Sequence, residues 1–144
     1  MFSRKLHEME SSTPMQMNLH VTLNTSYEDA LTRVTDALQA EGFGILTEID
    51  VKDTMKKKLD VDFRRYKILG ACNAPIAHRA LTAVPAVGLL LPCNVTVAEN
   101  DDGSVDVDII NPLMMAAFFD NPDMQKAASD AHEHLSRVAS SLES

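Results

Sequence analysis

The segment GLLLPCNVTVAENDDGSVDVDII, residues 88–110, decides the fold class of this 144-residue chain. Both of its halves are rich in valine, leucine and isoleucine. Asn100–Gly103 between them is a turn sequence, because Asn, Asp and Gly tolerate positive φ angles. Every second residue from 105 to 109 is Val or Ile and the residues between are Asp, as in a strand with one buried face. The segment therefore predicts an antiparallel hairpin, with strands over 88–98 and 104–110.

Strands and helices alternate in the sequence before this hairpin. Alternating apolar residues predict strands, and apolar residues spaced three and four apart predict helices. Thr25–Glu28 fits a capping box at a helix start, and Gly42 fits a helix end. We therefore expect strands over 15–23, 43–51 and 66–71, and helices over 25–42, 53–59 and 73–84. After the hairpin, an apolar run over 113–119 precedes a last helix over 121–142.

The predicted order of elements is β-α-β-α-β-α-β-β-α. The hairpin requires at least one antiparallel pair, which favours an α+β fold over a doubly wound α/β fold. We predict a single domain over residues 14–144, with one mostly antiparallel sheet covered on one face by helices. The other face then requires a partner or solvent. The polar, aperiodic residues 1–13 are expected to form a disordered tail.

Composition and charge exclude several classes of function. The chain has 13 basic and 21 acidic residues and a net charge of −8, which repels phosphate backbones, so we expect no nucleic-acid partner. No apolar run approaches the roughly 20 residues of a membrane span, and the N-terminal sequence lacks the apolar stretch of a secretory signal. We therefore expect a cytoplasmic protein with reduced cysteines and no membrane contact. Common enzyme motifs are missing, and enzymatic activity stays an open question.

Two cysteines are the best candidates for chemistry. Cys72 ends a predicted strand and precedes a helix, where backbone N–H groups favour a thiolate. Cys93 follows Pro92, and a proline within a strand implies an edge or a bulge. Each cysteine is followed by an asparagine, Asn73 or Asn94. We predict a small-ligand or thiol site at these two Cys-Asn pairs. The alternative is that both thiols are buried and inert.

Metal and cofactor binding receive little support. Cys72, His78 and Cys93 would supply the three protein ligands of an open zinc site. Nothing in their spacing requires a metal, so we predict none, and these three residues are the candidates if one is bound. The sequence identifies no cofactor. The run over 113–119 contains two Met and two Phe residues, and it fits a buried helix, a homodimer seam or a lipophilic pocket, because methionine adapts to varied shapes.

The segments YKILGACNAP (66–75), HRAL (78–81) and GLLLPCNVTV (88–97) together resemble the bacterial domain of unknown function family 302. The resemblance covers residues 15–142 and includes FGILTEI (43–49). It implies an α+β fold of the TATA-binding-protein-like kind, with a curved, mostly antiparallel sheet, helices on one side and a homodimer. It implies no established activity. Cys72 and Cys93 fall within the two cysteine-bearing segments of the family.

Three hypotheses for function follow. The first is a small cytoplasmic homodimeric binding protein, whose site near the Cys-Asn pairs takes a small, partly apolar ligand, a sulfur species or a metal. The second is a thiol-dependent redox or sulfur-transfer protein, with Cys72 as nucleophile and Cys93 as resolving thiol. It requires the two Cα atoms to lie within about 7 Å of each other. The third is a structural or protein-interaction module with inert buried cysteines.

Overall fold

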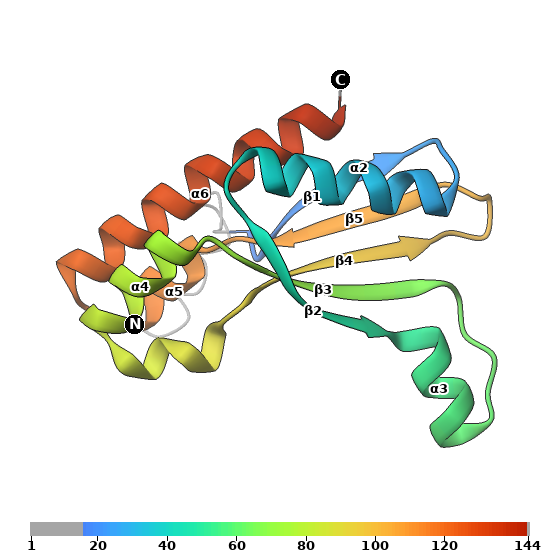
Figure 1. Ribbon diagram of the computed structural model, residues 1–144, viewed down its shortest axis with the longest axis horizontal. Coiled ribbons are helices and arrows are strands. Elements are labelled where there is room, and N and C mark those ends of the chain that lie inside the picture. The colour runs from blue at the N-terminus through green and yellow to red at the C-terminus, as the bar shows by residue number, and fades with distance from the viewer. Residues whose placement is uncertain (1–15, 144) are drawn as a thin grey trace, which may run out of the picture.

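The fold is a five-stranded antiparallel sheet with helices packed on one face (Figure 1), in a computed structural model that describes residues 16–143. The strand order is β1-β5-β4-β3-β2, and all neighbouring strands are antiparallel. The strands are β1 (Asn18–Leu23), β2 (Gly44–Asp50), β3 (Tyr66–Cys72), β4 (Cys93–Glu99) and β5 (Val105–Ile110). The helices are α2 (Tyr27–Ala40), α3 (Val51–Leu59), α4 (Ala74–Ala83), α5 (Leu113–Phe118) and α6 (Pro122–Glu143), with a 3-10 helix, η1 (Pro85–Leu90).

The predicted α+β class, the order of elements and the hairpin are confirmed. The alternating residues Val105, Val107 and Ile109 are fully buried. They pack with residues of β1, β3, β4, α2 and the C-terminal half of α6 in the main core. These three residues of β5, like Val95 and Val97 of β4, are β-branched, which suits the pleated surface of a sheet.

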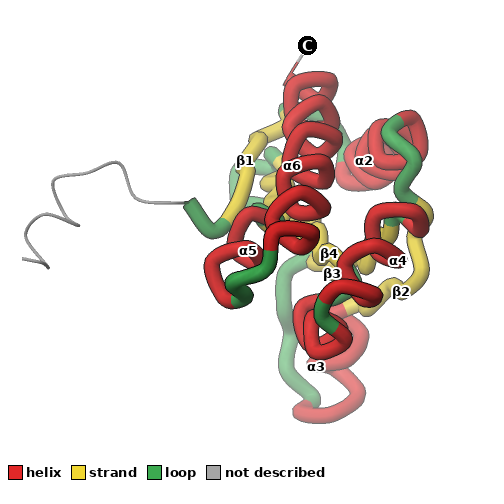
Figure 2. The backbone as a smooth tube through the Cα atoms, turned by 90° about the vertical axis from the view of Figure 1, so that its left-hand side faces the viewer, coloured by secondary structure: helices red, strands yellow, loops and turns green. Residues whose placement is uncertain are grey.

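A second cluster of buried residues lies at the other end of α6, where α4, η1 and α5 pack together. Its members are Ile76, Ala80, Val87, Met115, Met124, Ala127 and Ala131. Figure 2 shows α6 passing between α4 and α5, and the small residues Ala127 and Ala131 allow these helices to approach it closely. The long apolar stripe of α6 therefore packs into both the main core and the second cluster.

The strand predicted over 88–98 is wrong in its first five residues. Residues 85–90 form η1, and β4 begins only at Cys93. Pro85 starts this 3-10 helix, where its fixed φ angle and missing N–H are tolerated. Of the two alternatives that Pro92 implied, an edge or a bulge, the edge is excluded, because β4 pairs with both β3 and β5. Pro92 precedes the first ladder residue, so its missing N–H removes no hydrogen bond from the sheet.

Helix boundaries follow side-chain caps, with one correction. Ser26, not Thr25, caps α2 by accepting a hydrogen bond from the backbone N–H of Asp29 at 3.1 Å. Gly42 ends the helix as predicted, with φ at 83°. The backbone N–H of Phe43 donates to the carbonyl of Leu38 at 2.9 Å, which completes a Schellman motif and turns the chain into β2.

The outer face of the sheet is covered by no helix in the part of the chain described (Figure 1). Asp106 and Asp108 lie there, and they bind side chains of β1: His20 Nδ1 lies 2.7 Å from Asp108, and Thr22 donates to Asp106 at 2.8 Å. Because β5 pairs with both β1 and β4, these aspartates lie within the sheet and not along a free edge. The predicted tail over 1–13 and the domain boundary at 14 lie outside the described residues.

No helix within residues 16–143 combines the length and the apolar character needed to cross a bilayer.

Candidate ligand-binding site

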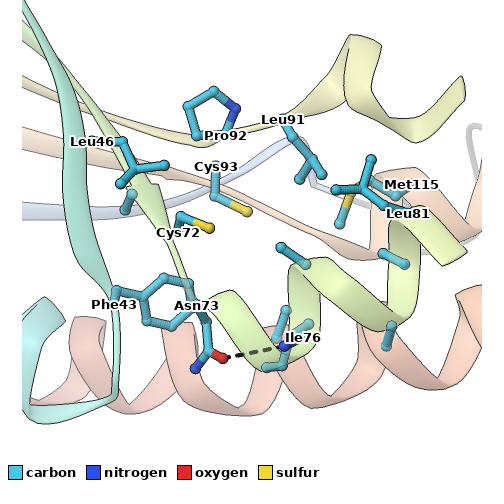
Figure 3. Close-up of a pocket in the computed structure, with 15 residues that line it drawn as sticks. Phe43, Leu46, Cys72, Asn73, Ile76, Leu81, Leu91, Pro92, Cys93 and Met115 are labelled. Atoms are coloured by element: carbon cyan, nitrogen blue, oxygen red, sulfur yellow. Dashed lines mark hydrogen bonds between the residues drawn. The ribbon is translucent and has the colours of Figure 1, made fainter. Parts of the chain in front are cut away.

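A pocket of about 280 Å³ opens where the main core meets the second cluster, between the end of the sheet and α4 (Figure 3). Its inner wall consists of buried residues from β3, β4, α4, α5 and α6. Leu46, 67% exposed, and Leu81, 40% exposed, stand at its mouth. The lining residues are Phe43, Leu46, Ala71, Cys72, Asn73, Ile76, Ala77, Ala80, Leu81, Leu91, Pro92, Cys93, Met115, Ala127 and Ala131.

An irregularity in β2 directs Leu46 to this mouth. Ile45 pairs with Ala71 and Thr47 pairs with Gly70, so Leu46 is an extra residue opposite β3. Such a β-bulge re-aims one side chain while the strands on either side keep their pairing. Gly70 is needed at this place, because a Cβ atom there would lie 2.6 Å from Cγ of Pro92 and even closer to Thr47. The bulge and the glycine together let β2, β3 and Pro92 converge beside the pocket.

Both cysteines line the pocket, as the sequence predicts for a shared site. Cys93 opens β4 and pairs with Ala71, the residue before Cys72, so the two cysteines are diagonal neighbours across the ladder. Ladder geometry places such Cα atoms roughly 6 Å apart. Both are free thiols, Cys93 buried and Cys72 partly buried. Strand alternation alone would place the Cys72 side chain on the outer face, but β3 ends at this residue and both thiols line the same pocket.

The two thiols differ in their surroundings. Burial, and to a smaller extent the neighbouring Cys72, raise the pKa of the Cys93 thiol to about 11. Cys93 is therefore almost fully protonated at neutral pH and behaves as a small apolar group. A protonated thiol is a poor nucleophile, which disfavours Cys93 as the resolving thiol of a redox pair.

The two asparagines have separate places. Asn73 lies at the pocket, but its side chain is engaged within the protein: Oδ1 accepts from the N–H of Ile76 at 3.3 Å and caps α4, and Nδ2 donates to the carbonyl of Glu41 at 3.4 Å. Asn94 is exposed on the outer face of the sheet and lines a different hollow, beside Leu89 and Phe118. The structure thus brings together three of the four predicted site residues, Cys72, Asn73 and Cys93, and leaves Asn94 outside.

The zinc candidates are not brought together. His78 lines a separate surface pocket with Arg79 and Asp123, on the other side of α4. Within residues 16–143, no group of three or more His, Cys, Asp or Glu side chains is arranged to hold a metal ion. Cys72 and Cys93 therefore supply only two of the three or four protein ligands that a zinc site requires.

The chemistry available in the pocket is narrow. Its lining includes no His, Asp, Glu, Lys, Arg, Ser, Thr or Tyr, so it offers no charged group and no general acid or base apart from the thiols. The walls are aliphatic, with one aromatic ring from Phe43 and one thioether from Met115. Such a lining favours the burial of a small apolar ligand over the activation of water.

Most residues of the pocket wall are not predicted from the sequence. No local motif marks Phe43, Leu46 or the α6 alanines, because they reach the pocket only through the bulge and the packing of distant helices. Met115 belongs to the 113–119 run, for which a lipophilic pocket is one of the three interpretations from the sequence. Leu91 lines the pocket, whereas Gly88 does not. Ala131 lies on the buried face of α6, but helical periodicity does not indicate which residues of such a face border a cavity.

Comparisons with known proteins agree with this fold. Over 93 residues the chain is 31% identical to an uncharacterized protein of Aquifex aeolicus (strain VF5), a match that covers 64% of this chain and 58% of that relative. The chain thus spans less than two thirds of the relative's length. A crystal structure of an uncharacterized conserved DUF302 protein from Bacillus stearothermophilus has a TM-score of 0.79 and 26% identity, and the match covers 88% of this chain and 98% of the other. Residues 19–142 match the profile described as domain of unknown function DUF302, and the chain belongs to this family.

Proposed function

We propose that this chain is a small cytoplasmic binding protein, which takes a small apolar molecule into the pocket between β3, β4 and α4. The observation that carries this proposal is the pocket itself, with about 280 Å³ of space, apolar walls and no charged side chain. Filling such a cavity with carbon contributes about 25 cal/mol for each Å² of apolar surface removed from water. A soluble protein gains nothing in stability from leaving this space unfilled.

Two variants of α4 test the pocket. Ala77 is partly buried and lines the cavity, whereas Ala74 is exposed on the same helix and does not line it. We expect the wild type and Ala74→Phe to enhance the fluorescence of a neutral apolar dye such as N-phenylnaphthylamine, and Ala77→Phe to lose that enhancement because its ring fills the space. Equal dye binding by Ala77→Phe and Ala74→Phe would refute the pocket as the site. Native mass spectrometry of the protein purified without reductant or chelator then identifies any ligand retained from the cell.

We also propose that the binding protein is a homodimer. The support is a patch of exposed apolar side chains, the Leu89 patch, which surrounds a second hollow adjoining the pocket at Leu91 and Pro92. Leu89 is 88% exposed, Phe118 67% and Met17 63%; Leu90 and Met114 complete the patch. Contiguous apolar surface of this kind is typical of protein–protein contacts. Part of the 113–119 run thus faces outward, as the dimer-seam interpretation requires.

The dimer surface is tested by a matched pair of leucines. Leu89 lies in the patch, and Leu59, 66% exposed on α3, lies outside it. Light scattering after gel filtration should give a dimer for the wild type and Leu59→Glu, and a monomer for Leu89→Glu. A monomeric wild type contradicts the dimer, and dissociation by Leu59→Glu alone would move the contact to α3.

A further inference from the structure

Three sulfur-bearing side chains from different elements line the same pocket. Cys72 ends β3, Cys93 begins β4 and Met115 lies in α5. Cys93 and Met115 are 7% and 6% exposed, so both sulfurs are withdrawn from bulk water. Figure 3 shows the two cysteines next to each other on the sheet side, with Met115 across the pocket beside Leu81. Apolar packing alone does not require this grouping, because aliphatic side chains would fill these positions equally well.

The chemistry of these atoms selects one class of ligand. Thiolate and thioether sulfurs are soft donors, which prefer Cu(I) among the common biological metal ions. Magnesium and calcium require oxygen ligands, and zinc sites normally have four ligands. Neither requirement is met at this pocket, whose lining contains no carboxylate and no histidine. A Cu(I) ion accepts fewer ligands and tolerates apolar surroundings.

The local backbone favours the charge that results. Binding of Cu(I) would replace the protons of both thiols, which leave to solvent, while copper remains Cu(I) and no electron is transferred. One monovalent cation and two thiolates leave a net charge of −1. Cys72 directly precedes the N-terminus of α4, a helix of 10 residues, and the positive end of the helix dipole stabilises a negative charge there. Met115 is a neutral ligand with an unbranched, adaptable side chain.

We propose that the pocket binds Cu(I), with Cys72 and Cys93 as thiolate ligands and Met115 as a thioether ligand. The inference rests on the proposed function because it uses the same pocket. It adds a metal ion to the small apolar molecule as a second class of ligand. The site differs from the zinc set that the sequence suggested, because Met115 takes the place of His78.

Anaerobic titration of the reduced full-length protein with Cu(I), in competition with the chromogenic chelator bicinchoninate, tests this site. We expect one Cu(I) per chain. Cys72→Ser and Cys93→Ser should each weaken binding at least about 100-fold, since even the loss of a group that only supports a ligand costs up to about 100-fold. Met115→Leu should weaken binding by a smaller factor. The matched control is Met114→Leu, because Met114 lines the other hollow and should leave the affinity unchanged.

X-ray absorption at the copper edge keeps the test independent of how well the variants fold. The copper-loaded wild type should show sulfur neighbours only. Nitrogen or oxygen ligands would overturn the proposal, as would failure to bind one equivalent or unchanged affinity in both cysteine variants. Binding of the apolar dye, measured on the same preparations, separates the two proposals. Dye binding without copper binding overturns only the copper site, and copper binding without dye binding overturns only the apolar ligand.

Discussion

Replacement of Gly70 by alanine should destabilise the protein and disturb the pocket. Gly70 lies in the middle of the sheet, on β3 between Thr47 of β2 and Asn94 of β4. A Cβ atom at this position would meet the Thr47 hydroxyl well inside contact distance, and would lie 2.6 Å from Cγ of Pro92. Thr47 is exposed and can rotate to another rotamer. The ring of Pro92 is tied to the backbone, so the chain around Pro92 must move.

The magnitude follows from the cost of overpacking. Forcing an extra methyl group into a tightly packed position costs about 1–3 kcal/mol, and we expect about 2 kcal/mol for Gly70→Ala because one of its two contacts is rigid. For a domain of this size that corresponds to a fall in Tm of roughly 8 °C. Pro92 also lines the pocket, so affinity for the apolar dye should fall as well. Chemical denaturation and calorimetry measure the first effect, and the dye assay measures the second.

Two further variants make this reasoning refutable. Gly44 is also a strand glycine, but a Cβ atom there meets nothing within 4 Å, so Gly44→Ala should leave stability unchanged or raise it by up to about 1 kcal/mol. In a Thr47→Ala background, Gly70→Ala should keep most of its cost, because the contact with Pro92 remains. Full rescue by Thr47→Ala would show that Pro92 is not the limiting contact. Stability within about 0.5 kcal/mol of wild type for Gly70→Ala would refute the argument altogether.

The remaining predictions concern Cys93, Asn73 and Arg65. Cys93 should resist alkylation by iodoacetamide in the folded protein until the pH approaches 11, where its pKa lies; rapid labelling at neutral pH, seen by peptide mass mapping, would contradict its burial. This folded-state pKa is raised from 9.0, so the thiol loses its proton in the unfolded chain at a lower pH than in the folded protein. The free energy of unfolding should therefore decline from pH 9 to about 11, and Cys93→Ala should remove this decline. Asn73→Ala should cost about 1 kcal/mol through loss of the α4 cap, and Asn73→Asp should keep the cap. Hydrogen bonding to Arg65 lowers the pKa of Glu99, so the ionised Glu99 stabilises the fold above its ordinary pKa, and this stabilisation is lost as the pH falls. In acid titrations the free energy of unfolding of Arg65→Met should therefore depend less steeply on pH than that of the wild type.

The sequence predicts local features well where a side chain acts on its own segment. The valines and isoleucine of residues 105–109 form the inner face of β5, and Gly42 and Asn73 form the predicted helix boundaries. The start of α2 is misplaced by one residue, because Thr25 and Ser26 are both good caps. The choice depends on Asp29: its backbone N–H donates to Ser26, and its carboxylate accepts from Thr25 at 2.6 Å.

Features that depend on distant partners are less visible in the sequence. Residues 88–91 have the composition of a strand, but Pro85 begins a 3-10 turn and Val87 is buried in the second cluster, which holds this segment away from the sheet. The place of β4 at the centre of the sheet depends on β1 returning to pair with β5, which no local pattern encodes. The sequence offers the two cysteines as candidates, but several walls of the pocket that they line come from β2, α5 and α6, which no local pattern connects to them.

The location of the pocket follows from the way α6 is shared. Its C-terminal half packs on the sheet and its N-terminal half packs on α4 and α5, so the two clusters meet at Ala127 and Ala131, whose side chains are too small to fill the junction. Larger residues here would close the cavity and gain stability, since unfilled space in a core costs about 24 cal/mol for each Å³. The bulge at Leu46 and the glycine at position 70 keep the junction open from the sheet side, because they allow Pro92 and β2 to converge without filling it. The proposed ligand would thus lie in a cavity bounded by small residues on one helix and by two thiols on the adjoining strands.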